Sequence, residues 1–379
     1  MASTPTRDPA AFSAEHERVI GCEKLDLDTP ALLLDLAVME RNIARMAATF
    51  REAGIGWRPH TKAIKVPALA HKLLAAGAFG VTCAKLGEAE VMAAGGIRDI
   101  LIANQVVGAA KIERLMRVLD VADVIVAVDH PDNVRELDRA ATASGHQLRV
   151  VIEVDIGMHR AGTEPGEPTL DLARLIDGCR GLRFAGVFGW EGQAVHIADL
   201  DLKQHEIERA IRLLTDTAER CRAAGLDVGI VSCGGTGTYQ HTARLRGITE
   251  VQAGGGIFCD LYYREEMHVD HEFALTILAT VTSRPTPTRI ICDAGKKTMS
   301  GDAAKPRLLL EAPVKSLGLS AEHATIEVAA PSHTPAIGDK VEFIVGYTDT
   351  TTMLHEELFG MRDGRVEVVW PILGRGKLR

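Results

Sequence analysis

A regular alternation of two residue patterns between positions 31 and 260 constrains the fold more than any other feature. Short runs rich in valine, isoleucine and leucine are each followed by a longer stretch with helical spacing and many alanines. Strand followed by helix, repeated along a chain, is typical of parallel βα units, and eight such units close into a (β/α)8 TIM-like barrel of about 250 residues. The expected strands are Ala31–Leu36, Gly56–His60, Phe79–Cys83, Asp99–Asn104, Asp123–Val128, Leu148–Asp155, Leu182–Trp190, Val228–Cys233 and Ile248–Ala253.

These candidates exceed the eight places of a barrel by one. We expect the first, Ala31–Leu36, to run outside the barrel and to pair with a second domain. The clearest expected helices are Ala37–Ala53, Pro67–Ala76, Leu86–Ala94 and Asp201–Ala224.

The pattern changes after about Tyr263, where helical spacing gives way to alternating or β-branched runs separated by turn signals. The expected strands of this region are Phe273–Ser283, Arg289–Asp293, Arg307–Leu319, Ala324–Ala329, Lys340–Gly346 and Val366–Pro371. The sequence therefore predicts an α/β chain in three parts. These are an N-terminal segment 1–36 that pairs with the β domain, a barrel over 37–262, and a mostly β C-terminal domain over 263–379.

Composition excludes several classes of protein. A net charge of −8 argues against nucleic acid or an anionic membrane as the main partner. No apolar run reaches the roughly 18–20 residues that span a bilayer. The first twenty residues lack the apolar core of a secretory signal, and we expect them to be loosely ordered. The seven cysteines are odd in number, widely spaced and without a CxxC pair, which favours reduced thiols in a cytoplasm.

Catalytic groups of such barrels lie at the carboxyl ends of the strands, so residues just after each strand are the candidates. Lys62 follows the strand Gly56–His60 within the stretch RPHTKAIK. Partial desolvation and nearby cations lower the pKa of a lysine in such a place, which makes it a candidate amine nucleophile for a Schiff base. The alternative is a solvated lysine at the start of a helix.

Two glycine-rich turns follow the seventh and eighth barrel strands, Gly234–Thr238 after Val228–Cys233 and Gly254–Gly256 after Ile248–Ala253. Such turns let several backbone N–H groups point at one anion, and a phosphate site at these two loops recurs in this fold. The alternative is a pair of flexible turns.

Arg160 and His196 follow two further strands, Leu148–Asp155 and Leu182–Trp190. The arginine could hold a phenolate or a carboxylate, and the histidine could act as a general base. Each is ordinary when taken alone. Together with a lysine at the mouth and a phosphate cradle, they form the set that pyridoxal 5'-phosphate chemistry requires, because the lysine forms the imine, the phosphate anchors the cofactor and the ring serves as an electron sink.

Seven segments that span nearly the whole chain carry a family resemblance: LDTPALLLDLAVMERNI, RPHTKAIK, EVDIGMHRAG, SCGGTGTY, EVQAGGGIFCD, CDAGKK and MRDGRVEVVWPILGRGK. The chain resembles the fold-type III pyridoxal-phosphate enzymes, in the group of D-threonine aldolase, D-serine dehydratase and 3-hydroxy-D-aspartate aldolase. The resemblance implies an alanine-racemase-like barrel with a following β domain, usually in a homodimer whose active sites lie near the interface.

The resemblance also implies roles for individual residues. Lys62 is then the Schiff-base lysine, His60 lies near the cofactor, Arg160 contacts the cofactor near its phenolic oxygen, and His196 takes the β-hydroxyl proton of the substrate. The implied phosphate cup consists of Gly235, Thr236, Gly237, Gly255 and Gly256.

One segment departs from the family pattern. The family's metal ligands are a His-x-Cys or His-x-Asp pair in a stretch like HCDPT-x-N-x-H, and here Tyr347 replaces the histidine whereas Asp349 is kept. A single carboxylate seldom holds Mn²⁺ or Zn²⁺ firmly, so we expect no tightly held divalent metal. Tyr347 or Asp349 could then orient the substrate hydroxyl, unless the substrate carries none. The alternative for Tyr347 is a buried aromatic at a strand end.

Three functions stay open at this point. The first is a lyase that cleaves D-3-hydroxy amino acids to glycine and an aldehyde, with dehydration to a 2-oxo acid as its variant. The second is a racemase or epimerase that exchanges only the Cα proton. The third is a cofactor-carrying protein without turnover, against which the β domain counts because such proteins consist of the barrel alone. Loss of the metal histidine favours aldol cleavage or proton transfer over dehydration, since a metal usually helps hydroxide to leave.

Overall fold

The computed structural model describes residues 18–379. Most of the segment expected to be loosely ordered, residues 1–17, lies outside the described residues.

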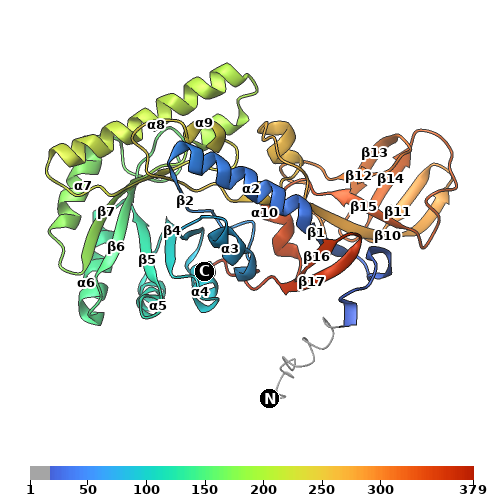
Figure 1. The fold of residues 1–379 in the computed structure, drawn as a ribbon, viewed down its shortest axis with the longest axis horizontal. Helices are drawn as coiled ribbons and strands as arrows, with labels where there is room; N and C mark the ends of the chain where they lie inside the picture. Colours follow the sequence, from blue (N-terminus) through green and yellow to red (C-terminus); the bar gives the residue numbers. More distant parts are fainter. Residues whose placement is uncertain (1–17) are drawn as a thin grey trace, which may run out of the picture.

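The first domain is built on a sheet of eight parallel strands in the order β2-β9-β8-β7-β6-β5-β4-β3 (Figure 1). The strands are β2 (Gly56–Trp57), β3 (Val81–Cys83), β4 (Asp99–Gln105), β5 (Asp123–Val128), β6 (Leu148–Glu153), β7 (Leu182–Phe188), β8 (Ile230–Cys233) and β9 (Glu250–Val251). The two ends of this order meet just beyond β2, where His60 bridges Thr82 in parallel register and the Thr61 N–H donates to the Thr82 carbonyl over 2.7 Å. The predicted barrel is confirmed.

Helices cover the outside of the barrel. They are α2 (Leu36–Ala53), α3 (Pro67–Ala75), α4 (Leu86–Ala94), α5 (Ala109–Leu119), α6 (Pro131–Ser144), α7 (Glu167–Asp177), α8 (Leu200–Ala223) and the short α9 (Tyr239–Thr242). Local chemistry fixes the ends of α2: the Asp35 carboxylate accepts a hydrogen bond from the Val38 N–H over 2.9 Å, and Gly54 ends the helix at φ +65°.

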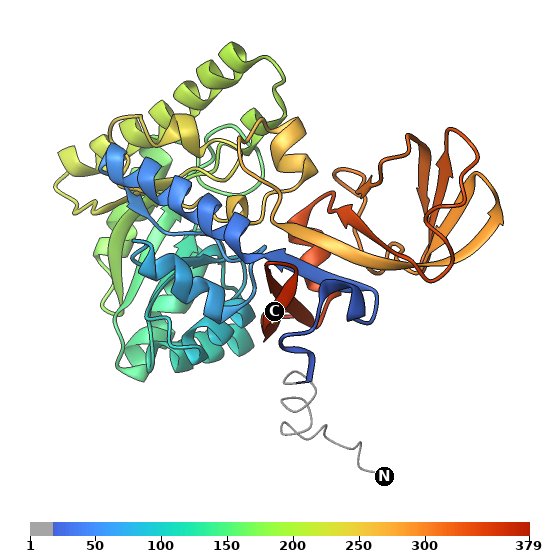
Figure 2. The ribbon, with the colours of Figure 1, turned by 45° about the vertical axis from the view of Figure 1, so that its right-hand side comes forward.

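The second domain is a mostly β structure, as predicted. Its sheet has nine strands in the order β13-β14-β11-β10-β1-β16-β17, and β15 pairs with both β10 and β12. The strands are β1 (Ala31–Asp35), β10 (Leu275–Thr286), β11 (Arg289–Cys292), β12 (Arg307–Leu309), β13 (Val314–Leu319), β14 (Ala324–Val328), β15 (Lys340–Ile344), β16 (Glu357–Arg362) and β17 (Arg365–Pro371). β1 runs antiparallel to β10 and parallel to β16, so the surplus strand joins this sheet rather than the barrel (Figure 2).

Two details of the β domain differ from the prediction. The run Arg307–Leu319, expected as one strand, forms β12 and β13 with a break at residues 310–313. Pro313 in that break has no N–H to give to a ladder. The strand β16 was not predicted, because Gly360 interrupts an otherwise weak alternation in Glu357–Arg362.

The chain's C-terminal tail returns to the barrel beside α3 and α4 (Figure 1). The Gly374 N–H donates to the Lys65 carbonyl over 2.9 Å, and the Gly87 N–H donates to the Arg379 carbonyl over 2.8 Å. The first of these bonds holds the backbone just after Lys62, and the second joins the tail to the start of α4.

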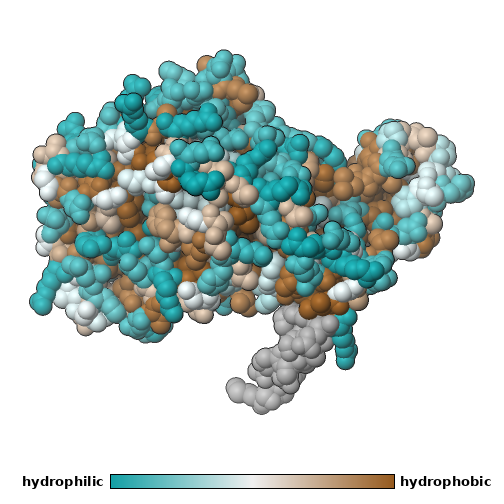
Figure 3. Space-filling view, in the orientation of Figure 1, coloured by the Kyte–Doolittle hydropathy of each residue, from teal (hydrophilic) through white to brown (hydrophobic). Residues whose placement is uncertain are grey.

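Hydrophilic residues cover much of the face drawn in Figure 3, with hydrophobic groups between them. Over residues 18–379, none of the helices combines the length and the apolar character that crossing a bilayer would need. All seven cysteines are free thiols.

Candidate active site

A cavity of about 310 Å³ opens at the carboxyl ends of the barrel strands, where the β domain adds Tyr347 to its wall. It brings together most of the residues predicted from sequence. Those that line it are His60, Lys62, Arg160, His196, Gly235, Thr236, Gly237, Gly255 and Tyr347. The remaining two lie just behind the wall: Asp349 contacts Lys62, and Gly256 adjoins Thr236.

Lys62 points its ammonium across the domain boundary. Its Nζ lies 2.9 Å from Oδ2 of Asp349. The same Oδ2 accepts a hydrogen bond from the Tyr347 hydroxyl over 2.9 Å, and Oδ1 accepts one from the Tyr263 hydroxyl over 3.2 Å. Since the Lys62 side chain is 45% exposed and Asp349 only 11%, the amine faces the cavity and the carboxylate holds it from behind.

Protonation in this cluster follows from burial and the ion pair. Burial acts to raise the pKa of Asp349, but the Lys62 ammonium and its hydrogen bond outweigh that effect and hold the pKa of this carboxyl below its usual value. Burial and the Asp349 charge raise the pKa of the Tyr347 and Tyr263 phenols. Both phenols are therefore neutral donors to a carboxylate.

His60 is a neutral imidazole at the base of the cavity. Burial and the adjacent Lys62 ammonium lower the pKa of His60 to about 3. Its Nδ1 accepts a hydrogen bond from the Lys62 backbone N–H over 3.3 Å, so the ring proton is carried on Nε2.

The two glycine-rich turns lie against each other, as one shared anion site requires. A Cβ added to Gly256 would come within 3.3 Å of Thr236 Cγ2. All four residues with relevant amides, Thr236, Gly237, Gly255 and Gly256, are buried, and within residues 18–379 their backbone N–H groups donate to no protein acceptor. Buried backbone donors are rarely left unpaired. Thr236, Gly237 and Gly255 line the cavity and Gly256 adjoins them, an arrangement that suits an anion.

The carboxylate of Glu191, directly beyond β7, holds the first of these turns from below. Its Oε1 accepts hydrogen bonds from the Thr238 and Thr242 hydroxyls, both over 2.7 Å, and its Oε2 accepts one from the Gly234 N–H over 3.1 Å. The Thr238 hydroxyl is thereby used inside the protein.

Arg160 lines the cavity from the loop after β6. Its Nη2 lies 3.6 Å from Oε1 of Glu153, and Gln105 donates to Oε2 of the same carboxylate over 2.6 Å. More than half of the Arg160 side chain is exposed, so the guanidinium keeps donors free for a group in the cavity.

His196 lies at the mouth, at the end of a 3-10 turn over Gly192–His196. The Tyr262 hydroxyl is 3.3 Å from its Nε2 and 3.4 Å from its Nδ1, and the Tyr262 ring meets the Tyr347 ring edge-on at 5.1 Å between centroids. An imidazole and two phenols therefore surround the entrance.

Sequence reasoning missed the two adjacent tyrosines Tyr262 and Tyr263, which line the cavity, and the buried Glu191 and Asp260. Asp260 accepts the N–H groups of Tyr263 and Thr348, each over 2.7 Å, and so joins the two domains behind the site. The paired tyrosines directly after a glycine-rich strand end were a usable signal, but the role of the carboxylates depends on partners far away in sequence.

The donor set around Asp349 does not fit a firmly held divalent metal. Its oxygens are engaged by an ammonium and two neutral phenols, none of which is a ligand for Mn²⁺ or Zn²⁺ at this protonation state. His355, the histidine at the end of the same segment, has its Nε2 bonded to the Thr298 carbonyl over 2.7 Å. Within residues 18–379 no group of three histidine, cysteine or acidic side chains is placed to share an ion.

Comparison with known proteins finds a family match for each domain of the chain. Residues 34–261 match the family "Alanine racemase, N-terminal domain", and residues 274–361 match a serine dehydratase domain family. The sequence is 34% identical to the D-threonine aldolase of an Arthrobacter species, with 92% of this chain and 93% of that protein covered. It is 33% identical to the 3-hydroxy-D-aspartate aldolase of Paracoccus denitrificans, with 94% of each covered. The crystal structure of D-threonine aldolase from Filomicrobium marinum superimposes with a TM-score of 0.92 at 34% identity, over 95% of this chain and 99% of that one.

The fold and the site thus define an alanine-racemase-like barrel enzyme. The chain belongs to the alanine racemase N-terminal domain family, in the fold-type III branch that carries a serine-dehydratase-type second domain and includes the D-threonine and 3-hydroxy-D-aspartate aldolases. The resemblance drawn from sequence motifs is confirmed.

Proposed function

We propose that this protein is a pyridoxal 5'-phosphate-dependent lyase that cleaves D-3-hydroxy amino acids into glycine and an aldehyde. One observation carries the proposal: the exposed amine of Lys62 and the cradle of unpaired N–H groups belong to the same cavity. An amine and an anion cradle in one cavity are what an aldehyde cofactor with a phosphate tail needs.

The residues present fit that cofactor. Thr236, Gly237, Gly255 and Gly256 would hold the phosphate with their amides, and Arg160, which lines the same cavity, would contact the phenolic oxygen. When bound, the cofactor's ring supplies a sink for the electron pair of the bond broken at Cα. Lys62 would supply the amine that condenses with the cofactor's aldehyde with loss of water, and Asp349 and His60 fix the position of that residue.

Retro-aldol cleavage requires removal of the β-hydroxyl proton. His196 lies at the mouth with its ring nitrogens within 3.4 Å of the Tyr262 hydroxyl, where a substrate hydroxyl would replace or extend that contact. We assign the proton to His196. The Tyr347 hydroxyl, anchored on Asp349, orients the same substrate oxygen.

We further propose that the reaction proceeds without a tightly bound divalent metal, because an ammonium and two phenols occupy Asp349. We also propose that the protein is a homodimer, that its substrate is a small D-amino acid and that it is located in the cytoplasm. The seven unpaired thiols support that location.

The test is incubation of the holoenzyme with D-threonine in heavy water, with and without EDTA. We expect glycine and acetaldehyde in equal amounts, unchanged by EDTA. Loss of product on adding EDTA would refute the metal-independent reading. Deuterium at Cα without aldehyde would refute cleavage in favour of racemase action. The Lys62→Ala variant is the control, and it should show neither reaction nor the absorption band of the imine.

A dehydratase is the second candidate, and the match of residues 274–361 to a serine dehydratase domain family favours it. Dehydration of D-threonine would give 2-oxobutyrate and ammonia in place of glycine. A keto-acid assay on the same incubation separates the two lyase reactions.

A further inference from the structure

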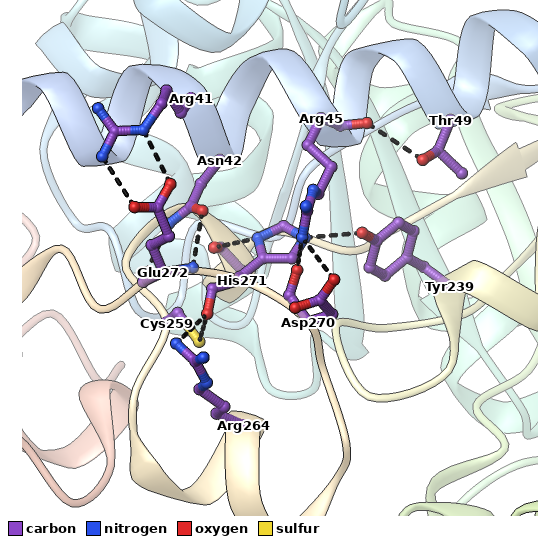
Figure 4. Close-up of polar contacts among 11 residues, drawn as sticks. Arg41, Asn42, Arg45, Thr49, Tyr239, Cys259, Arg264, Asp270, His271 and Glu272 are labelled. Carbon is purple, nitrogen blue, oxygen red and sulfur yellow. Dashed lines mark hydrogen bonds and ion pairs between the residues drawn. The ribbon is translucent and has the colours of Figure 1, made fainter.

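A buried hydrogen-bond chain crosses from one glycine-rich turn to the other behind the cavity. The Tyr239 hydroxyl lies 2.7 Å from Nε2 of His271, and Nδ1 of His271 lies 2.8 Å from the Gly256 carbonyl (Figure 4). Tyr239 directly follows the first turn, Gly234–Thr238, and Gly256 belongs to the second.

The direction of this chain is fixed by its ends. A carbonyl can only accept, so Nδ1 of His271 carries the ring proton and donates to Gly256. Nε2 is then bare and accepts from the Tyr239 hydroxyl. Both side chains are buried, Tyr239 at 0% exposure and His271 at 1%. Burial lowers the pKa of His271 to about 4 and raises the pKa of Tyr239 to about 12, so neither group is charged at neutral pH.

The segment that carries His271 is itself held in place. Figure 4 shows it lying along α2, where Asn42 accepts from the Glu272 N–H over 3.1 Å and donates to the Glu272 carbonyl over 2.8 Å. The His271 carbonyl accepts from Arg264 over 3.0 Å. The imidazole therefore stands at a fixed place between α2 and the two turns.

We propose that His271 and Tyr239 are positioning residues that lock the two glycine-rich turns in register for the phosphate of the cofactor. Turns made of glycine have many accessible conformations, and holding four amides on one anion costs conformational entropy unless other contacts fix them. Glu191 fixes only the first turn. The His271 chain joins the second turn to it, so the cradle exists before the anion arrives. The inference rests on the proposed cofactor.

The test measures affinity for the phosphate separately from affinity for the rest of the cofactor. Full-length protein freed of cofactor is titrated with pyridoxal 5'-phosphate and with pyridoxal, which lacks the phosphate, and the ratio of the two dissociation constants is compared between variants. Tyr239→Phe removes only the hydroxyl. His271→Asn keeps a donor for Gly256 but loses the acceptor for Tyr239. Arg41→Gln is the matched control, because it breaks an exposed ion pair to Glu272 on the same segment.

We expect the wild-type and Arg41→Gln proteins to prefer the phosphorylated ligand equally. Tyr239→Phe and His271→Asn should each reduce that preference by roughly fivefold to thirtyfold, the effect of one or two lost hydrogen bonds. The double variant should lose no more than either single variant, because both remove the same link.

Two results would overturn the proposal. If affinity for both ligands falls in parallel in the variants, the chain supports the barrel as a whole and not the phosphate turns. If affinity for both ligands is unchanged, the link does no positioning. A wild-type protein that binds pyridoxal 5'-phosphate no better than pyridoxal would instead refute the phosphate cup itself, and with it the proposed function.

Discussion

At the scale of single residues, two lysines of one stretch differ by their surroundings. Lys62 is 45% exposed at the cavity, whereas Lys65 is 7% exposed and lies 3.8 Å from the buried carboxylate of Glu88. Lys65 has a left-handed backbone at φ +55°, and its carbonyl accepts a hydrogen bond from the Gly374 N–H of the C-terminal tail. Access to a ligand, rather than residue type, therefore singles out Lys62.

The hydroxyl of Tyr347 offers the first residue-scale prediction. Tyr347→Phe keeps the ring but removes a donor to the Asp349 carboxylate, and a hydrogen bond to a charged group is worth about 1.5–3 kcal/mol. If this hydroxyl orients the substrate oxygen, kcat for aldol cleavage should fall about tenfold to a hundredfold with KM little changed. Steady-state kinetics of this variant are compared with those of Tyr263→Phe, which removes the donor to the other oxygen of Asp349. A kcat within twofold of wild type would show that Tyr347 only packs.

A second residue-scale prediction concerns pH. The pKa of His271 is about 4 in the folded protein, against about 6.5 in an unfolded chain. Burial and the nearby Arg45 lower it, and the hydrogen bond to the Gly256 carbonyl and the Asp270 charge oppose them. Between pH 6.5 and pH 4, His271 binds a proton in the unfolded state but not in the folded state. The contribution of His271 to stability is therefore complete above that pH and is lost as the pH falls towards 4.

The measurement compares urea unfolding of the wild type and His271→Asn at pH 7.5 and pH 5. Because the asparagine does not titrate, the difference in unfolding free energy between the two proteins should shift by about 2 kcal/mol against the wild type at the lower pH. An equal difference at both pH values would show that the pKa of His271 is the same in the folded and unfolded states.

At the scale of elements, the loops after β7, β8 and β9 act as one unit. Glu191 beyond β7 holds the turn after β8, and His271 links that turn to the one beyond β9. None of these contacts is local in sequence. The site is therefore built by neighbouring strand ends of the barrel, as the fold requires.

Glu191→Gln tests this unit. The amide nitrogen of glutamine would face a donor in place of one carboxylate oxygen, which leaves a buried N–H or hydroxyl without an acceptor. We expect the free energy of unfolding to fall by about 1–3 kcal/mol and the cofactor to dissociate more readily. Urea denaturation and equilibrium dialysis check the two effects. Unchanged values in both would mean that the turn is held by other contacts.

Several elements were predictable because their patterns are local. The strand Asp123–Val128 and the helix Leu86–Ala94 have the bounds read from the sequence. Strand β16 was not predicted from the sequence, because Gly360 weakens its alternation of apolar and polar residues. The short helix α10 (Thr348–Thr351) was also missed, since a single turn leaves no period to detect. Lys62 and the glycine turns could be predicted because each directly follows a predicted strand. Asp349, the partner of Lys62, could be predicted only through the family motif, because 287 positions separate Asp349 from Lys62.

At the scale of the whole molecule, the two domains meet at the site. The barrel supplies Lys62, the β domain supplies Tyr347 and Asp349, and Asp260 accepts backbone N–H groups from Tyr263 and Thr348. The position of the Lys62 amine therefore depends on how the domains are docked.

Asp260→Asn tests that docking. It replaces one of two accepting oxygens by an N–H₂ group that would point at a backbone N–H, a buried mismatch worth about 1–3 kcal/mol. We expect a lower unfolding free energy together with weaker cofactor retention, although Asp260 does not line the cavity. Thermal unfolding of the apo and holo forms measures both. A variant as stable as the wild type in both forms would show that the domains are held together elsewhere.

The most direct measurement of the central claim is borohydride reduction of the holoenzyme followed by peptide mass spectrometry. Reduction makes the bond between the cofactor and its lysine permanent, so the modified residue can be identified. We predict the pyridoxyl phosphate mass on Lys62 alone, with Lys65 in the same peptide unmodified. A modification on Lys65 or another lysine, or none at all, would contradict the site described.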